Sequence, residues 1–275
     1  MKISIFTTYT NPEERKDPWR EALNCYEDFA DEIIVTGKDW PYEFSWDLIG
    51  KTFEKGYQKS TGDWVIRMDI DYFFHEKNLK RLSKLLSDYN DYPGVVFPQY
   101  QFFTPDRFQL KTRLCVALNK KRFPEIKLNG GGDLCLATLN GKLLDVNKLP
   151  NLNIPIFQYD SMFRTKKIIA KDRARFARAW ERHFKNYGKR GGSTDLEAFN
   201  AWFREIESKY KMHTNRIKFS QHPKYIKDTL SSINYDQFGF NAFGLKDNTK
   251  RSIKSYTKGK KELYIDSLLI NRSLK

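Results

Sequence analysis

The chain has 275 residues, of which 40% are hydrophobic and 15% aromatic, and this composition excludes an intrinsically disordered protein. No apolar stretch approaches the roughly 20 residues of a membrane-spanning helix, so we expect no transmembrane segment and a cytoplasmic protein. The net charge of +15 lies entirely in residues 151–275, which carry 27 basic and 12 acidic residues, whereas residues 1–150 carry 22 of each.

Three units of a strand followed by a helix are predicted in the first 90 residues. Apolar side chains alternate in the strands, as at Ile3 and Ile5, and recur every three or four residues in the helices, as at Leu82 and Leu86. The expected strands cover residues 2–7, 31–37 and 63–68, and the expected helices cover residues 18–30, 45–59 and 76–86. Repeated units of this kind favour a parallel, doubly wound sheet, which binds ligands at the carboxyl ends of its strands.

The rest of the chain is predicted to add a short strand, a mixed region and two helices. The strand covers residues 94–98, and mixed strands and loops follow at 99–160. The helices cover 163–184 and 194–210, the second with Thr194 and Glu197 as a capping box. We therefore divide the chain into a core at 1–160, a basic helical region of the same domain at 161–235, and a basic C-terminal extension at 236–275.

Asp69 and Asp71 directly follow the third predicted strand, and they are the strongest indication of function in the sequence. In an extended chain, residues two apart point to the same side, so both carboxylates are expected at the ligand-binding edge of the sheet. Paired carboxylates bind hard divalent cations such as Mg²⁺ and Mn²⁺, which complete their coordination with substrate phosphates. The pattern therefore predicts a site for a cation and a diphosphate.

The motif Gly62-Asp63-Trp64-Val65 leads into this acidic pair. With it, residues 1 to about 230 resemble the nucleotide-sugar glycosyltransferases of the GT-A fold, in particular the family-two-like group and its phage and viral members. The resemblance implies an α/β fold, Rossmann-like, with a mostly parallel central sheet flanked by helices and a basic helical C-terminal part. It also implies a hexosyltransferase-type enzyme that uses Mn²⁺ or Mg²⁺ and a nucleotide-diphosphate sugar, with a UDP-sugar favoured.

The resemblance further implies two groups of ligand-binding residues. Asp69 and Asp71 would hold the cation, and Asp69 would also contact the nucleotide sugar. Gln158 stands where a subgroup of the family has a third metal ligand, a histidine, which leaves Asp160 as a substitute. The nucleotide would be held by residues that follow the first two strands: Thr7, Thr8, Tyr9, Lys38 and Asp39.

Asp133 is the candidate catalytic base. It follows three consecutive glycines at 130–132, in the region where GT-A enzymes carry their base, and the glycines would let a substrate approach closely. A carboxylate near the acceptor hydroxyl is what an inverting transfer requires. A Gly-rich turn with a capping Asp is the alternative reading, and a retaining enzyme would need no base at this position.

Other side chains leave two readings open. His75 is either a further metal ligand or the cap of the following helix, and we favour the cap. Trp40, Tyr42 and Trp46 either stack on a nucleobase or sugar or belong to the core.

Lys171, Arg175, Arg178 and Arg182 form one stripe along the predicted helix at 163–184. Few acidic residues are interleaved with them, so the stripe favours an anionic acceptor over a merely solvated face. Three classes fit: nucleic acid, an anionic polysaccharide, and a lipid-linked glycan at a membrane surface that the protein contacts peripherally. The glycosyltransferase group that this sequence resembles includes phage and viral enzymes that glycosylate DNA bases. The resemblance therefore makes DNA modification one expected function.

Two other functions are weighed against the transferase. A non-catalytic, basic nucleic-acid-binding protein would have a purely structural Asp pair and would bind DNA in a salt-sensitive manner. A nucleotidyltransferase of the same fold would usually carry a glycine-rich loop after the first strand, but residues 7–12 contain no glycine, so this reading ranks last.

Overall fold

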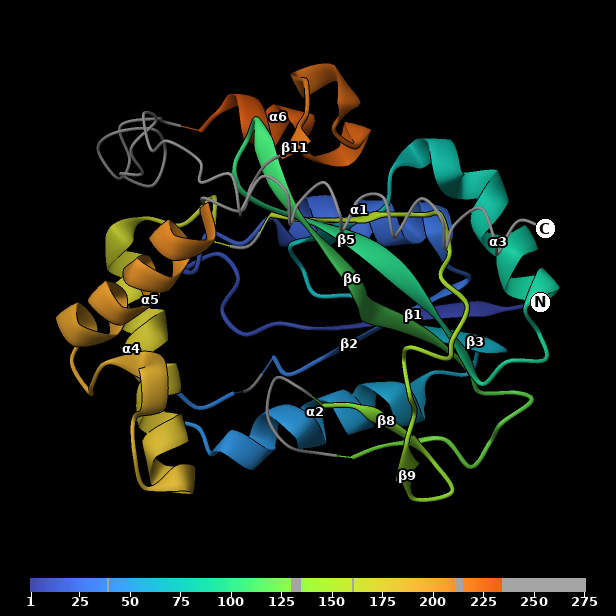
Figure 1. Cartoon of the computed structure of the whole chain (residues 1–275), viewed down its shortest axis with the longest axis horizontal. Helices are drawn as coiled ribbons and strands as arrows, with labels where there is room; N and C mark the ends of the chain where they lie inside the picture. The colour runs from blue at the N-terminus through green and yellow to red at the C-terminus, as the bar shows by residue number, and fades with distance from the viewer. Residues whose placement is uncertain (39, 130–134, 160, 211–214, 234–275) are drawn as a thin grey trace.

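The computed structural model describes residues 1–38, 40–129, 135–159, 161–210 and 215–233 (Figure 1). Within these residues, one sheet runs in the order β2-β1-β3-β6-β5-β10-β4, with β11 paired to β6. Its strands are β1 (Ile3–Thr8), β2 (Glu32–Thr36), β3 (Trp64–Arg67), β4 (Tyr72–Phe73), β5 (Gly94–Thr104), β6 (Arg107–Asn119), β10 (Ile156–Gln158) and β11 (Asn215–Arg216). A small second sheet contains β7 (Lys127–Leu128), β8 (Ala137–Leu139) and β9 (Lys142–Leu143).

The five predicted helices are confirmed, and the short helix α6 (Lys227–Ser231) is an addition that the periodicity does not predict. The α-helices are α1 (Trp19–Phe29), α2 (Trp46–Lys59), α3 (Leu79–Asp88), α4 (Lys166–Phe184), α5 (Asp195–Tyr210) and α6 (Lys227–Ser231). Short 3-10 turns are η1 (Glu76–Asn78), η3 (Gly188–Arg190), η4 (Phe219–Gln221) and η5 (Lys224–Ile226). The predicted capping box of α5 is confirmed, because Glu197 N donates to Thr194 Oγ1 and Thr194 N donates to Glu197 Oε2. In the described part of the chain, no helix is both long and apolar enough to cross a membrane.

The strand directions confirm a mixed α/β sheet in which most strands run the same way. β1 is parallel to β2 and β3, and β5 is parallel to β10. β6 is antiparallel to β3 and β5, and β4 is antiparallel to β10. The division into the segments 1–160, 161–235 and 236–275 stays a prediction, and residues 236–275 lie outside the described part.

Two helices cover opposite faces of the sheet (Figure 1). Ile3 and Ile5 pack in one core cluster with α1, whereas Phe6 and Val65 pack in another with α2. The connection from β1 to β2 therefore runs on one face and the connection from β2 to β3 on the other. Where successive connections change from one face of the sheet to the other, the loops after the two neighbouring strands, here β1 and β3, diverge. Open α/β sheets bind ligands in the crevice between such loops.

The strand predicted at residues 94–98 is longer than expected. β5 continues through Pro98 to Thr104 and pairs with β6, and the pairing shifts register between Phe97 and Gln99. Proline cannot donate a hydrogen bond to the neighbouring strand, so a proline within a paired strand is usually found at a bulge. The bulge lets the strand pass the residue at which the sequence predicts its end.

His222 attaches residues 215–233 to the sheet. Its imidazole is fully buried, with Nδ1 at 2.8 Å from the Tyr159 hydroxyl and Nε2 at 2.9 Å from the carbonyl oxygen of Pro105. Because a carbonyl can only accept, Nε2 carries the proton and Nδ1 accepts from Tyr159. Burial lowers the pKa of His222 to about 4, so the folded protein holds this imidazole neutral.

We predict that His222 makes stability fall on acidification from neutral pH. The unfolded chain, where the histidine pKa is 6.5, binds the proton before the folded chain does, so stability is lost as the pH falls from about 6.5 towards 4. The full loss is up to roughly 3 kcal/mol. Urea unfolding of wild type and His222→Gln between pH 7.5 and 4.5 measures it. The glutamine does not titrate, so equal pH slopes in the two proteins would contradict the prediction.

Candidate functional site

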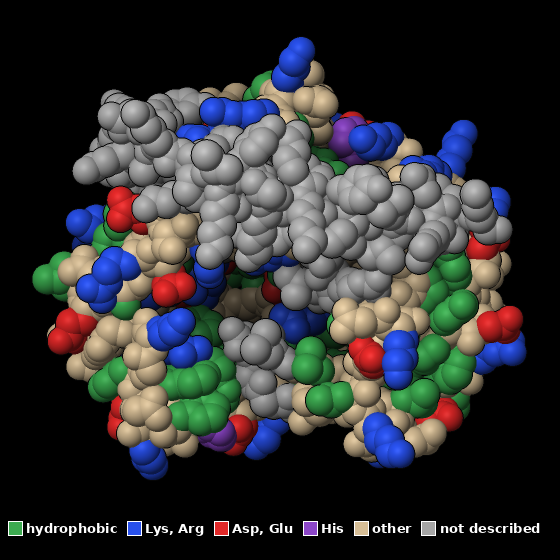
Figure 2. All heavy atoms as spheres, in the orientation of Figure 1, with side chains coloured by type: hydrophobic (Ala, Val, Ile, Leu, Met, Phe, Trp, Pro, Cys, Tyr) green, Lys and Arg blue, Asp and Glu red, His purple; other side chains and the backbone are tan. Residues whose placement is uncertain are grey.

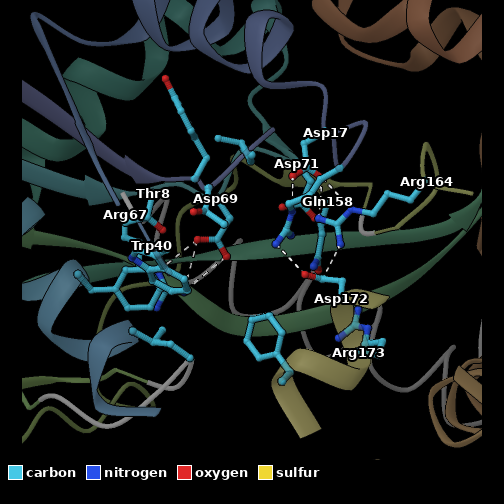
Figure 3. Close-up of a pocket in the computed structure, with 17 residues that line it drawn as sticks. Thr8, Asp17, Trp40, Arg67, Asp69, Asp71, Gln158, Arg164, Asp172 and Arg173 are labelled. Atoms are coloured by element: carbon cyan, nitrogen blue, oxygen red, sulfur yellow. Dashed lines mark hydrogen bonds and ion pairs between the residues drawn. The ribbon is translucent and has the colours of Figure 1, made fainter. Parts of the chain in front are cut away.

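A pocket of about 300 Å³ opens at the carboxyl ends of β1 and β3 (Figure 3). Figure 2 shows this face of the molecule hollowed beside α4, with basic and acidic side chains around the hollow. The lining comes from the ends of β1 and β3, the loops after β1, β2 and β3, α2, β10, the segment before α4, and α4 itself. The lining residues are Thr8, Tyr9, Thr10, Arg15, Asp17, Trp40, Ile49, Phe53, Arg67, Asp69, Ile70, Asp71, Gln158, Arg164, Asp172, Arg173 and Phe176.

Asp69 and Asp71 both line this pocket, but they lie on a turn and not in an extended segment. β3 ends at Arg67, and the N–H of Tyr72 donates to the carbonyl of Asp69 at 2.8 Å, which closes the turn. The Tyr26 hydroxyl donates to the same carbonyl at 2.6 Å. The expectation of an extended chain at residues 69–71 is therefore wrong. Ile70 is buried in the core, so the chain turns around this side chain and still leaves both acidic residues at the pocket.

Arg67 pairs with Asp69. Its guanidinium lies 3.4 Å from both oxygens of the carboxylate and stacks over the ring of Phe53, 3.7 Å from the ring centroid. The side chains of Arg67 and Asp69 are 26% and 32% exposed, so solvent reaches both. Arg67 is a charged residue at the end of an apolar strand, and this departure from the pattern is the sequence signal that could have identified it.

A buried ion cluster closes the other end of the pocket. Arg164 contacts Asp17 at 2.6 Å and Asp172 at 3.2 Å, and Arg15 contacts the same two carboxylates at 3.0 Å and 2.8 Å. Burial opposes the charge on Arg164, but Asp17, Asp172 and, more weakly, Asp71 raise its pKa and keep it charged. Burial likewise opposes ionisation of Asp172, and the nearby arginines hold its pKa below the usual range.

Gln158 contributes a buried oxygen to the site. Its Oε1 has no hydrogen-bond partner among the described residues, and the Gln158 backbone pairs with Tyr72, directly after Asp71. Such an oxygen is costly to bury unless a ligand completes its contacts. Figure 3 shows Gln158 between Asp71 and Asp172 at the pocket.

Asp69, Asp71 and Gln158 form the set of oxygen donors that a divalent cation would use in this pocket. The described residues contain no group of three or more His, Cys, Asp or Glu that could hold a metal. Asp69, Asp71 and Gln158 nevertheless offer oxygen atoms to one pocket, and Mg²⁺ is commonly held by one or two protein carboxylates together with substrate phosphates. The described residues therefore fit a cation that binds together with a phosphorylated ligand.

Aromatic and apolar side chains line the part of the pocket next to Arg67. Trp40 lies with Ile49 and Phe53, and its Nε1 donates to Thr52 Oγ1 at 3.0 Å. Gly37 lies behind Trp40 with a φ of +85°, a conformation that favours glycine, and a Cβ here would be 3.1 Å from Trp40 Nε1. The partly buried ring of Trp40 thus has a fixed position in the pocket wall.

The other predicted site residues are placed as follows. Thr8 and Tyr9 line the pocket, whereas Thr7 is buried in β1 and Lys38 is exposed outside the lining. Asp39, Asp133 and Asp160 lie outside the described residues, so their roles stay predictions.

The structure distinguishes between the alternatives for His75 and for the aromatic residues Trp40, Tyr42 and Trp46. His75 caps η1 by accepting from the N–H of Lys77, as favoured from the sequence. Trp46 is buried in the core, whereas the Tyr42 side chain is 58% exposed and lies against Arg175. Trp40 is the member of this aromatic group that lines the pocket.

The arginines of the predicted stripe contact residues 41–44. Arg175 Nε donates to the Tyr42 carbonyl at 2.7 Å, Arg178 Nε donates to Glu43 at 2.9 Å, and Arg182 donates to Glu43 and to the Phe44 carbonyl. Arg175 is buried, so its guanidinium is a structural tie between α4 and this segment. Lys171 is exposed. Binding of an anionic acceptor by the stripe stays a prediction.

The chain matches no protein-family model and none of the curated proteins. Among solved structures, residues 1–349 of TarS from S. aureus in complex with UDP show 11% identity and a TM-score of 0.36, over 97% of this chain and 92% of that chain. The same protein with UDP-GlcNAc shows 11% identity and a TM-score of 0.35, over 78% and 82%. A glycosyltransferase involved in the glycosylation of the major capsid of PBCV-1 shows 14% identity and a TM-score of 0.28, over 44% and 60%. These values are too low to assign a family or an activity to the chain.

We predict that Gly37→Ala costs more stability than Gly141→Ala. Both glycines have positive φ, at +85° and +76°, so each substitution costs about 1 kcal/mol of backbone strain. A methyl group at residue 141 meets nothing within 4 Å, whereas one at residue 37 presses on Trp40 and Thr52. Urea unfolding and near-ultraviolet circular dichroism compare the two variants. Equal losses, with the aromatic signal unchanged, would refute the supporting role of Gly37.

Removing Arg164 is expected to destabilise the fold by about 3–5 kcal/mol, because Arg164→Met leaves two buried carboxylates with fewer counter-charges. Arg122 provides the matched control. It pairs with Asp91 at the surface, where the two side chains are 54% and 80% exposed, so Arg122→Met should cost no more than about 1 kcal/mol. Both values come from urea unfolding at pH 7. A loss as small as the control's would show that the cluster does not hold the pocket together.

Proposed function

We propose that this protein is a metal-dependent glycosyltransferase. It moves a sugar from a nucleotide-diphosphate sugar, with a UDP-sugar favoured, to a hydroxyl of an anionic acceptor. The observation that supports the proposal is that Asp69, Asp71 and Gln158 line one pocket at the carboxyl ends of β1 and β3. The Gln158 Oε1 there is buried and has no hydrogen-bond partner within the described part of the chain. Oxygen ligands beside arginines, with an aromatic wall, suit a cation-bound diphosphate and its nucleoside.

The pocket offers separate surfaces to the parts of the donor. Asp69, Asp71 and Gln158 are the residues that would hold the cation. Trp40 and the apolar side chains beside it suit the nucleobase, which has a flat π-face. The bound cation supplies charge neutralisation on the departing diphosphate, as divalent ions do in such transfers.

The arginines of the pocket would act on the same diphosphate. A guanidinium forms two parallel hydrogen bonds to phosphate oxygens and keeps its charge at every physiological pH. Arg15 and Arg173 line the pocket with Arg67 and Arg164. Their charge would stabilise the leaving group during cleavage of the sugar-phosphate bond.

The acceptor half of the reaction rests on sequence features. Asp133 is proposed as the base that takes the proton of the acceptor hydroxyl in an inverting transfer. The excess of basic residues in 151–275 is the reason to propose an anionic acceptor, with nucleic acid, polysaccharide and lipid-linked glycan as the three classes.

Thermal unfolding tests the donor site. We expect UDP-sugars, and more weakly GDP-, CDP- or TDP-sugars, to stabilise the wild-type protein only in the presence of Mn²⁺, by about 2.7 kcal/mol at 100 times the Kd. Asp71→Asn should abolish the stabilisation and leave the fold intact. Asp91→Asn, at an 80% exposed side chain outside the pocket lining, is the matched control and should respond as wild type.

The same experiment separates the proposed function from its main alternative. If no donor stabilises the protein with or without Mn²⁺, the transferase proposal fails. A non-catalytic nucleic-acid-binding protein would instead show DNA binding that weakens steeply with salt and is unchanged in Asp71→Asn.

A further inference from the structure

We infer that Arg67 is the resident counter-cation of Asp69 and has to leave this carboxylate for the divalent cation to bind. Binding of the cation is thereby coupled to binding of the nucleotide diphosphate, which offers the released guanidinium a new partner. The inference rests on the proposed function and adds to it a residue that makes the two ligands bind together.

The position of Arg67 in β3 is the first support. Trp64, Val65 and Ile66, which precede it, are fully buried, and the strand alternation places Arg67 on the same face as Val65, towards α2. Placing a guanidinium at the end of such a strand costs free energy unless the charge is compensated. Asp69 and the ring of Phe53 provide that compensation in the protein without ligands.

The geometry of the Arg67–Asp69 pair shows that it can be displaced. Charge-assisted hydrogen bonds between nitrogen and oxygen usually span about 2.7–2.9 Å, whereas Arg67 lies at 3.4 Å from both Asp69 oxygens. About a third of the Asp69 side chain is exposed, so water screens the attraction. The pair therefore neutralises the carboxylate without locking it, and a divalent cation competes for the same two oxygens.

The charge balance of the pocket explains the coupling. The described lining residues include four arginines and four aspartates, so this described lining is formally neutral. A divalent cation alone would bring two uncompensated positive charges next to Arg67, and the diphosphate of a sugar nucleotide alone would bring two negative charges. Together the two ligands leave the pocket neutral, so each should strengthen the binding of the other.

The experiment measures Mn²⁺ binding directly, by electron paramagnetic resonance, in wild type and in Arg67→Gln. Without nucleotide, we expect Arg67→Gln to bind Mn²⁺ about fivefold to tenfold more tightly, because the competing positive charge is gone. With saturating Mn²⁺, we expect Arg67→Gln to bind UDP several-fold more weakly, because the released guanidinium no longer meets the diphosphate. Isothermal titration calorimetry measures the UDP affinity.

Two further variants keep the test sharp. Arg122→Gln removes the same charge at a surface ion pair outside the pocket lining, so its Mn²⁺ affinity should match wild type and exclude a general effect of net charge. In the Asp69→Asn background, Arg67→Gln should raise Mn²⁺ affinity less than it does in wild type, because direct competition for the shared carboxylate is gone and only charge repulsion remains. Circular dichroism and thermal unfolding confirm that each variant is folded, and Arg67→Lys, which keeps the charge, should stay close to wild type in Mn²⁺ affinity.

The outcomes are distinguishable. Tighter Mn²⁺ and weaker UDP binding in Arg67→Gln support the inference. Unchanged Mn²⁺ affinity in Arg67→Gln, in a wild-type protein that binds Mn²⁺ and UDP together, overturns the inference and leaves the proposed function standing. Absence of both Mn²⁺ and UDP binding in the wild type overturns the proposed function, and the inference with it.

Discussion

The ion cluster of Arg15, Asp17, Arg164 and Asp172 is the constraint on which the pocket depends. Two buried carboxylates are tolerated only where positive charges meet them, and here the positive charges come from the loop after β1 and from the segment before α4. The cluster therefore fixes segments that are about 150 residues apart in sequence. The walls of the pocket are held by electrostatics at one end and by aromatic packing around Trp40 at the other.

Pairing of charges also explains why α4 contains so many arginines. Arg178 and Arg182 share Glu43, and the residues around Glu43 lead back to Trp40. An arginine has five donors and satisfies carbonyls and carboxylates at once, so it can tie a loop to a helix in a way that an apolar contact cannot. Part of the positive charge in the second half of the chain is therefore used inside the protein.

The sequence predicted the strand-helix units well, because hydrophobic periodicity is a local property that survives in the fold. It also predicted that Asp69 and Asp71 lie together at the edge of the sheet, and both line the pocket there. It failed where tertiary contacts decide. The turn at these two residues depends on burial of Ile70, and the continuation of β5 past Pro98 depends on pairing with β6. The arginines of α4 contact residues 41–44, which lie more than 130 residues away in the sequence, and a local pattern cannot predict such a contact.

Several residues of the pocket carried no recognisable signal in the sequence. Arg15, Asp17 and Arg164 lie in segments without periodicity or motif, and only the fold brings them together. Arg67 is different, because a charged residue at the end of an apolar strand departs from the pattern around it. Gln158 was predicted as a site residue from a resemblance. The sequence does not show that its Oε1 is buried without a hydrogen-bond partner among the residues that the structure describes.

The docking of residues 215–233 has a consequence for how the chain folds during synthesis. α1 is completed within the first 30 residues, yet its Glu21 accepts from the Thr229 hydroxyl and its Asp28 accepts from the Tyr225 hydroxyl. Ile226 and Leu230 belong to the same core cluster as Ile3 and Ile5. The first strand and helix leave the ribosome long before these partners exist, so the nascent chain exposes an incomplete core until almost all described residues have been made.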